Sequence, residues 1–242
     1  MKAPVFIASQ PGLIIGCMAV ALGLAAGGRF LFMDGGSWTI LAVVATAVIF
    51  TLAAADSAHL LDYQVAPGRW LGSAVVCAVV AAAVAAGVLG VAMFVMQDDS
   101  PYYSGYDSFI VTSGPVEWLD TNGQPYIVPD AGVGGREVVL SLLVVFTVFL
   151  AAALVGVGLG AVRARRSARA QWVVAFAGIA ATVAVAWLID QVLGISVPAP
   201  LPGVFLFCIP VAVVGVVVAA VSLQRSRTRW VGSADRAKLA RS

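Results

Sequence analysis

Six long apolar segments limit what this chain can fold into more than any other feature of its sequence. Each is about 18 residues or longer, which lets a helix cross roughly 30 Å of hydrocarbon at about 1.5 Å per residue. Without a closed barrel, backbone polar groups inside lipid can be satisfied only within helices. We therefore expect an all-α polytopic membrane protein with six transmembrane helices, at residues 11–33, 38–55, 70–96, 138–162, 172–192 and 203–223.

The charged residues predict how these helices are oriented. Once the segments are threaded through a bilayer, twelve of the fourteen Lys and Arg residues fall on one side and nine of the twelve acids on the other. Cationic loops near span ends stay cytoplasmic, so both termini are predicted to be cytoplasmic. Arg29 and Arg136 depart from this pattern. The arginines are interpreted as anchors to the lipid bilayer, the first expected partner, and not as nucleic-acid ligands.

Composition and motifs exclude several classes of protein. An apolar content of 61% with 11% charged residues does not describe a soluble globular domain. The single histidine, His59, leaves no histidine-rich metal site, and no serine-hydrolase or zinc-protease motif occurs. Lysine occurs only at Lys2 and Lys238, so the chain has no lysine-containing phosphate-binding loop. We expect no catalytic residue, metal or cofactor here. The bias towards Ala, Val, Gly and Arg suggests a bacterial plasma membrane.

The chain is expected to divide into four parts: residues 1–96 with the first three spans, an extracytoplasmic cap at 97–137, residues 138–223 with the last three spans, and a basic cytoplasmic tail at 224–242. Within the first part, a cytoplasmic loop at 56–69 is expected to form a short helix that ends at Pro67-Gly68. The cap is about 40 residues long and cannot bury a large core of its own, so we expect it to rest on the helix ends or on another subunit.

The cap is predicted to contain a β-hairpin. Residues 116–119 and 125–128 flank Asn122-Gly123, a dipeptide that favours a type I′ turn. We expect Trp118 and Tyr126, which lie in these two strands, to contact a partner. The acids and aromatics of the cap could also form a lid, or a docking surface for a cationic substrate. Three further tyrosines follow the third span closely and are interpreted as interfacial belt residues: Tyr102, Tyr103 and Tyr106.

Arg29 and Asp190 are the two charges nearest to lipid, each within a turn or two of the predicted outer boundary. One interpretation is that each head group snorkels to interfacial water. The other is an Arg29–Asp190 ion pair between the first and fifth spans, at the outer mouth of a pathway. The sequence leaves both open.

Pairs of glycines four residues apart create faces on which helices can approach closely. Such spacings also arise by chance in a chain this rich in Ala and Gly, so they indicate helix packing and not dimerisation. The pairs are Gly12 and Gly16, Gly23 and Gly27, and Gly156 and Gly160.

A stretch within and just after the cytoplasmic loop resembles a known family. Leu60-Leu61-Asp62-Tyr63-Gln64-Val65-Ala66-Pro67-Gly68-Arg69-Trp70-Leu71 is similar to the Leu-Leu…Pro-Val…Arg…Leu stretch between spans two and three in permease subunits of bacterial ABC exporters of the second export class. The resemblance implies a permease energised by a separate cytoplasmic ATPase, with a second membrane subunit completing the pathway. It places the ATPase contact on the loop, at Asp56, Leu60, Leu61, Asp62, Tyr63 and Arg69.

The alternative is a non-catalytic accessory or structural subunit of a larger membrane complex. No acid or base lies in the middle of a predicted span, which favours this alternative and argues against a proton-relay pump. The cytoplasmic loop favours the transporter subunit. An independent channel, carrier or enzyme is a third class, and the sequence identifies no substrate.

Overall fold

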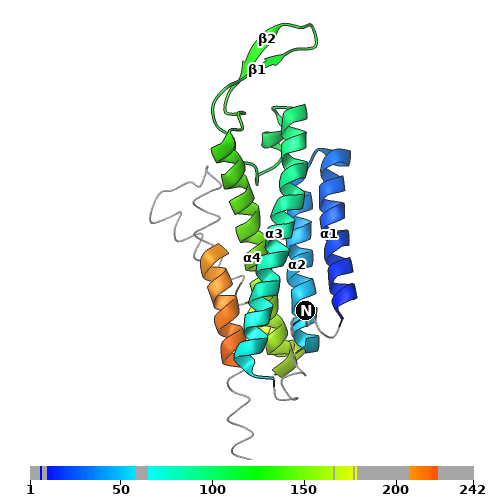
Figure 1. Cartoon of the computed structure of the whole chain (residues 1–242), viewed down its shortest axis with the longest axis vertical. Helices are drawn as coiled ribbons and strands as arrows, with labels where there is room; N and C mark the ends of the chain where they lie inside the picture. The colour runs from blue at the N-terminus through cyan, green and yellow to red at the C-terminus, as the bar shows by residue number, and fades with distance from the viewer. Residues whose placement is uncertain are drawn as a thin grey trace, which may run out of the picture.

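The computed structural model describes residues 6, 10–57, 65–165, 167–176, 178 and 208–222 (Figure 1). Four helices within them are long and apolar enough to cross a membrane, which fits a multi-pass membrane protein. These are α1 (Pro11–Phe32), α2 (Gly35–Ser57), α3 (Pro67–Asp99) and α4 (Gly135–Arg165). They match the first four predicted spans. A shorter apolar helix, Cys208–Ser222, falls within the sixth, and most of the fifth lies outside the described residues.

The first two helices are separated by a very short turn. α1 ends at Phe32 and is capped by Met33, whose backbone is left-handed (φ 55°) and whose N–H donates to the Arg29 carbonyl at 2.9 Å. The Asp34 carboxylate then accepts the backbone N–H of Ser37 at 3.0 Å, which satisfies a free donor in the first turn of α2. This hydrogen bond lowers the pKa of Asp34 below its usual value. The chain therefore reverses at Met33 and Asp34, between the first two predicted spans.

Pro67 does not end a helix as predicted. It is the first residue of α3, and the extended Ala66 precedes it. A proline is well suited to this position because its fixed φ is helical and its missing N–H would have had no partner there. The short helix expected earlier in the loop lies outside the described residues, which stop at Ser57 and resume at Val65.

α2 and α4 make the most extensive helix pair, and glycine makes their close approach possible. A methyl group added at Gly156 would run into the backbone carbonyl of Ala47, and one at Gly160 would run into that of Thr51. This pair is therefore a packing face, as predicted. By contrast, a methyl group added to any of the glycines at positions 12, 16, 23 and 27 of α1 would meet no atom within 4 Å.

The small-residue packing extends to the shorter helix. Gly158 of α4 lies against the backbone of Gly215, and Gly215 in turn lies against the Leu154 carbonyl. The outward-facing side chains of α1 to α4 include many exposed Leu, Val, Ile and Phe residues, as expected of a bundle that faces lipid.

The cap residues between α3 and α4 contain one antiparallel hairpin, β1 (Val116–Leu119) and β2 (Pro125–Val128), which projects beyond the helices (Figure 1). The predicted hairpin is confirmed, but its turn is not type I′. Gly123 is left-handed (φ 79°) whereas Asn122 is not, and the Asp120 N–H donates to the Gln124 carbonyl at 2.9 Å. The Asp120 carboxylate also accepts N–H groups of Asn122 and Gln124, which stabilises a longer turn with a single left-handed glycine.

Candidate functional site

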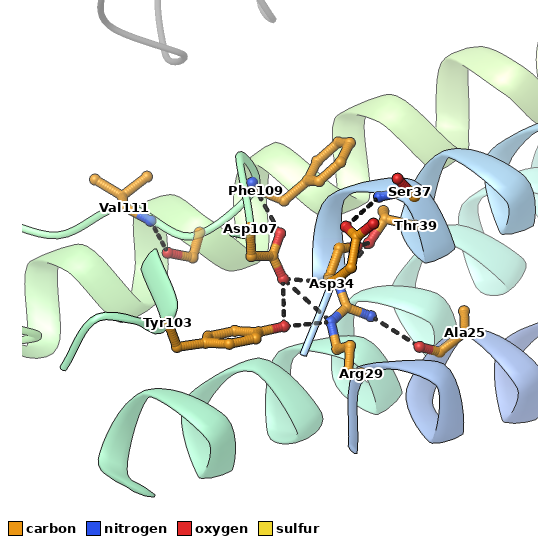
Figure 2. Close-up of polar contacts among 11 residues, drawn as sticks. Ala25, Arg29, Asp34, Ser37, Thr39, Tyr103, Asp107, Phe109 and Val111 are labelled. Carbon is orange, nitrogen blue, oxygen red and sulfur yellow. Dashed lines mark hydrogen bonds and ion pairs between the residues drawn. The ribbon is translucent and has the colours of Figure 1, made fainter. Parts of the chain in front are cut away.

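A buried ion pair lies where the cap meets the helices. Arg29, near the end of α1, is completely buried, and its Nη2 lies 3.1 Å from Oδ2 of Asp107 (Figure 2). Its Nε donates to the same carboxylate oxygen and to the Tyr103 hydroxyl, each at 3.1 Å. The remaining donors reach the Ala25 carbonyl at 3.5 Å and the Thr39 hydroxyl. The guanidinium is thus held by α1, α2 and the cap together.

The carboxylate of this pair is equally well satisfied. Asp107 Oδ2 accepts the Tyr103 hydroxyl at 2.9 Å as well as the arginine, and Oδ1 accepts the backbone N–H of Phe109 at 3.0 Å. A buried ion pair is stable only when further hydrogen bonds compensate both charges, and here they do. We call Arg29, Thr39, Tyr103 and Asp107 the arginine cluster.

Tyr103 belongs to the short 3-10 helix η3 (Tyr103–Gly105) and is fully buried. Burial, followed by the negative charge of Asp107, raises the pKa of Tyr103 far above its usual value. The hydroxyl therefore stays protonated and donates to Asp107. The interfacial-belt interpretation of Tyr103 is wrong, because its ring lies under the cap and its hydroxyl is used by the cluster.

One glycine leaves room for the cluster itself and another leaves room for the neighbouring Trp38. A methyl group added at Gly35 would run into the Asp107 carboxylate and the Tyr103 hydroxyl, and one at Gly28 would run into the indole of Trp38. In the sequence, Gly35 is one of two adjacent glycines between the first two predicted spans. In the structure, its missing side chain also lets the start of α2 approach the carboxylate.

Further polar contacts fasten the cap to α4. The backbone N–H of Val111 donates to the Ser141 hydroxyl at 2.8 Å, and the Ser113 hydroxyl donates to Oε1 of Glu137 at 2.7 Å. Oε2 of Glu137 accepts the backbone N–H of Gly134 at 3.1 Å. The cap therefore rests on the helix ends of its own chain, one of the two arrangements that the sequence predicted.

A pocket of about 490 Å³ opens between the cap and the adjoining ends of α3 and α4. Gln97 lies in its wall, and its Nε2 donates to the carbonyls of Ala131 at 2.9 Å and Pro101 at 3.2 Å. Its Oε1 is the one buried side-chain nitrogen or oxygen atom, among the described residues, that lacks a hydrogen-bond partner. The pocket is lined by Phe94, Val95, Gln97, Asp98, Pro101, Val116, Trp118, Ala131, Val133 and Val138.

The structure pairs Arg29 with Asp107, and the predicted partner Asp190 lies outside the described residues. Snorkelling does not describe Arg29, because its head group is buried under the cap.

Trp118 and Tyr126 are opposite one another in the hairpin and are both half-buried. Tyr126 stacks on Tyr102 with ring centroids 6.4 Å apart, and its hydrogen bond to Tyr102 raises the pKa of Tyr126 to about 12.

The predicted docking loop is described only at its two ends. Asp56 is exposed in the last turn of α2, and Arg69 is exposed in the first turn of α3. The four central candidates lie outside the described residues: Leu60, Leu61, Asp62 and Tyr63.

The ends of this loop are joined by contacts that the sequence did not predict. Nε1 of Trp70 donates to the Ser57 hydroxyl at 3.0 Å, and both side chains are fully buried. Phe6 stacks on Phe50 and lies edge-on to Trp70, with centroid distances of 5.7 and 5.6 Å. The N–H of Phe6 donates to the Ser73 hydroxyl at 2.9 Å. We call Phe6, Phe50, Ser57 and Trp70 the aromatic cluster.

No metal site is found among the described residues, which contain no group of three or more His, Cys, Asp or Glu side chains placed to hold an ion. Comparison with family models, curated proteins and solved structures finds no match to this chain. Any functional assignment therefore depends on the geometry described above.

Proposed function

We propose that this chain is the membrane-spanning permease subunit of a multi-subunit ABC-type exporter, energised by a separate ATPase that docks on the loop at 56–69. The observation that carries the proposal is the aromatic cluster, which joins the two ends of that loop through Ser57 and Trp70. A loop with fixed ends loses less conformational freedom on binding, and it passes force from a bound partner directly to α2 and α3. The resemblance around residues 60–71 assigns the ATPase to the same loop.

The proposal includes six spans, cytoplasmic termini and a bacterial plasma membrane. The exposed Arg69 and Arg163 support this orientation, because they belong to the start of α3 and the end of α4, which lie at the end of the bundle opposite the hairpin. Arg29 was an exception to the charge rule, and its burial against Asp107 supplies a physical reason, since a compensated charge does not attract lipid phosphates.

Labelling of single cysteines tests the topology in a variant lacking the native cysteines at positions 17, 77 and 208. We expect Asn122→Cys, at the exposed hairpin turn, to react with an impermeant maleimide in intact cells. Ser233→Cys in the tail should react only after the membrane is opened. The reverse pattern, or labelling of both in intact cells, contradicts the orientation.

Co-purification after gentle detergent extraction tests the function. We expect an ATPase to accompany the wild type, and the Leu60→Ser, Leu61→Ser variant to lose it while still inserting. The control is Leu119→Ser, which changes an exposed leucine in the hairpin and should keep the ATPase. Normal ATPase binding by the loop variant rules out the docking site, and the absence of any ATPase from the wild type rules out the permease.

The second candidate function is an accessory subunit that holds a larger membrane assembly together. The arginine cluster favours it, because a fully compensated buried ion pair positions the cap and leaves no free group for transport chemistry there. This candidate predicts a membrane partner and no ATPase after extraction. It also predicts that Trp118→Ala weakens that partner's binding.

A further inference from the structure

The hairpin has one face that packs on the cap and one that does not. Side chains alternate between the two faces along each strand, so Trp118, Tyr126 and the buried Val128 share the inner face. Trp118 lines the pocket between the cap and the helices, and Tyr126 stacks on Tyr102. The four remaining strand residues on the opposite side are called the hairpin face: Glu117, Leu119, Pro125 and Ile127.

The hairpin face is apolar although it is exposed. Leu119 is 63% exposed and Ile127 is 64% exposed. When one face of an antiparallel sheet is packed and the other meets water, the second face is normally polar. The exposed apolar side chains of the helices face lipid, but the hairpin projects beyond the helix ends, so lipid does not account for these two residues (Figure 1). An apolar face of this kind marks an interaction surface.

The charge of the surrounding cap indicates the chemistry of the partner. Residues 97–135 contain six Asp and Glu residues and no Lys, Arg or His. Arg29 compensates only Asp107. A second copy of the hairpin face would bring like charges together, and anionic lipid would also be repelled, whereas a cationic partner is attracted. Four of the other five acids are exposed: Asp98, Asp99, Glu117 and Asp130.

We propose that the hairpin face is a docking surface for another protein, which presents to it a segment carrying apolar side chains together with Lys or Arg. The apolar side chains of the partner cover Leu119 and Ile127, and its cations face Glu117. Interfaces commonly combine an apolar centre with a charged rim in this way. The docking surface does not depend on whether the chain is a permease or an accessory subunit.

Photo-crosslinking in membranes of the cell that makes this chain tests the proposal. With p-benzoylphenylalanine in place of Ile127, we expect an adduct with a second protein, and mass spectrometry should place Lys or Arg residues beside the crosslinked position. The same crosslinker in place of Tyr106, which is exposed on the cap outside the hairpin, is the control and should give little of this adduct. The proposal is overturned by adducts only with lipid, only with a second copy of this chain, or with a segment that lacks Lys and Arg, and equally by no adduct.

Matched variants, each combined with the crosslinker at Ile127, separate the charge from the apolar contact. Glu117→Lys should lower the adduct yield at least about tenfold, because it sets like charges against each other. Asp99→Lys makes the same change of charge at the end of α3 and should leave the yield within about twofold, since solvent and salt screen it. Equal effects of the two would mean that general surface charge attracts the partner, and would overturn the docking surface.

Leu119→Ser tests the apolar contact and should lower the adduct yield by about tenfold, as loss of a buried leucine side chain predicts. An unchanged yield would overturn the docking surface. Co-purification of the ATPase should be the same in this variant and in the wild type, because the proposed ATPase loop lies at the opposite end of the bundle. Failure of the hairpin proposal is therefore distinguishable from failure of the permease proposal.

Discussion

The two ends of the helical bundle are held together by different physical means. At the hairpin end, the arginine cluster joins α1, α2 and the cap through an ion pair and directional hydrogen bonds. At the opposite end, the aromatic cluster joins α2, α3 and Phe6 mainly by packed rings, with a single tryptophan–serine hydrogen bond. Directional contacts fix one geometry and fail when one partner is lost, whereas packed rings tolerate small shifts. The helices are thus positioned more exactly at the hairpin end of the bundle than at the opposite end, where small shifts are tolerated.

The largest effect is expected from breaking the ion pair on one side only. Arg29→Met should lower the free energy of unfolding by about 3–5 kcal/mol, because it leaves a buried, unpaired Asp107 carboxylate. The double variant Arg29→Met, Asp107→Leu should recover much of this loss. Thermal unfolding in detergent measures both, with the exposed Arg136→Met as a control that changes little. Strictly additive effects would show that the pair is not coupled.

The packing of α2 against α4, which lies between the two ends of the bundle, should be the next most sensitive to substitution. Gly156→Ala places a methyl group against the backbone of α2 and should cost about 1–3 kcal/mol. Gly16→Ala, on the open face of α1, should instead stabilise its helix by roughly 0.5–1 kcal/mol. Opposite signs in the same unfolding assay confirm the packing, and equal signs contradict it.

A smaller effect is expected at the aromatic cluster. Trp70→Phe keeps an aromatic ring but removes the donor to Ser57, so it should cost about 1–2 kcal/mol. Trp172→Phe is the control, since Trp172 is 59% exposed and its ring contacts Phe176, which is also exposed. A cost for Trp70→Phe as large as that of Arg29→Met would remove the distinction between the two ends.

Tyr103→Phe should have the smallest effect at neutral pH, about 1 kcal/mol, because Asp107 keeps its other partners. The contribution of Tyr103 to the free energy of unfolding should become visible at alkaline pH. The folded protein raises the pKa of Tyr103 above the unfolded value of about 10, so its contribution is complete below pH 10 and is lost as the pH rises beyond that. Hydrogen exchange should show the cap opening before the aromatic cluster in alkali, and the Tyr103→Phe variant should lose this difference.

The sequence predicts those features that depend on local pattern. Helices α1 to α4 follow from the length of the apolar runs, and the hairpin follows from two short β-prone segments around a turn dipeptide. The predicted turn type is wrong because the Asp120 carboxylate captures two backbone N–H groups and favours a longer turn. The prediction for Pro67 is wrong because proline marks both ends of helices, and only the conformation of Ala66 distinguishes them.

The partners in the candidate site could not be predicted, because they are far apart in the chain. Arg29 lies 78 residues before Asp107, and the sequence offers several acids on the same side of the membrane. A signal was available, however. A lone arginine near the end of an apolar run either snorkels to water or pairs with a carboxylate. Tyr103 and Asp107 share a four-residue spacing that brings a donor to an acceptor within one turn. No sequence pattern marks the unsatisfied Gln97 oxygen, since it arises only when the cap folds back.

α3 runs without a break from Pro67 to Asp99, and at about 1.5 Å per residue its 33 residues form a rod roughly 50 Å long. Its first turn carries Trp70, beside the loop at 56–69, and its last turns carry Gln97 and Asp98, in the wall of the pocket. Any rigid-body movement of α3 would therefore displace Trp70 at one end of the bundle together with Gln97 at the other.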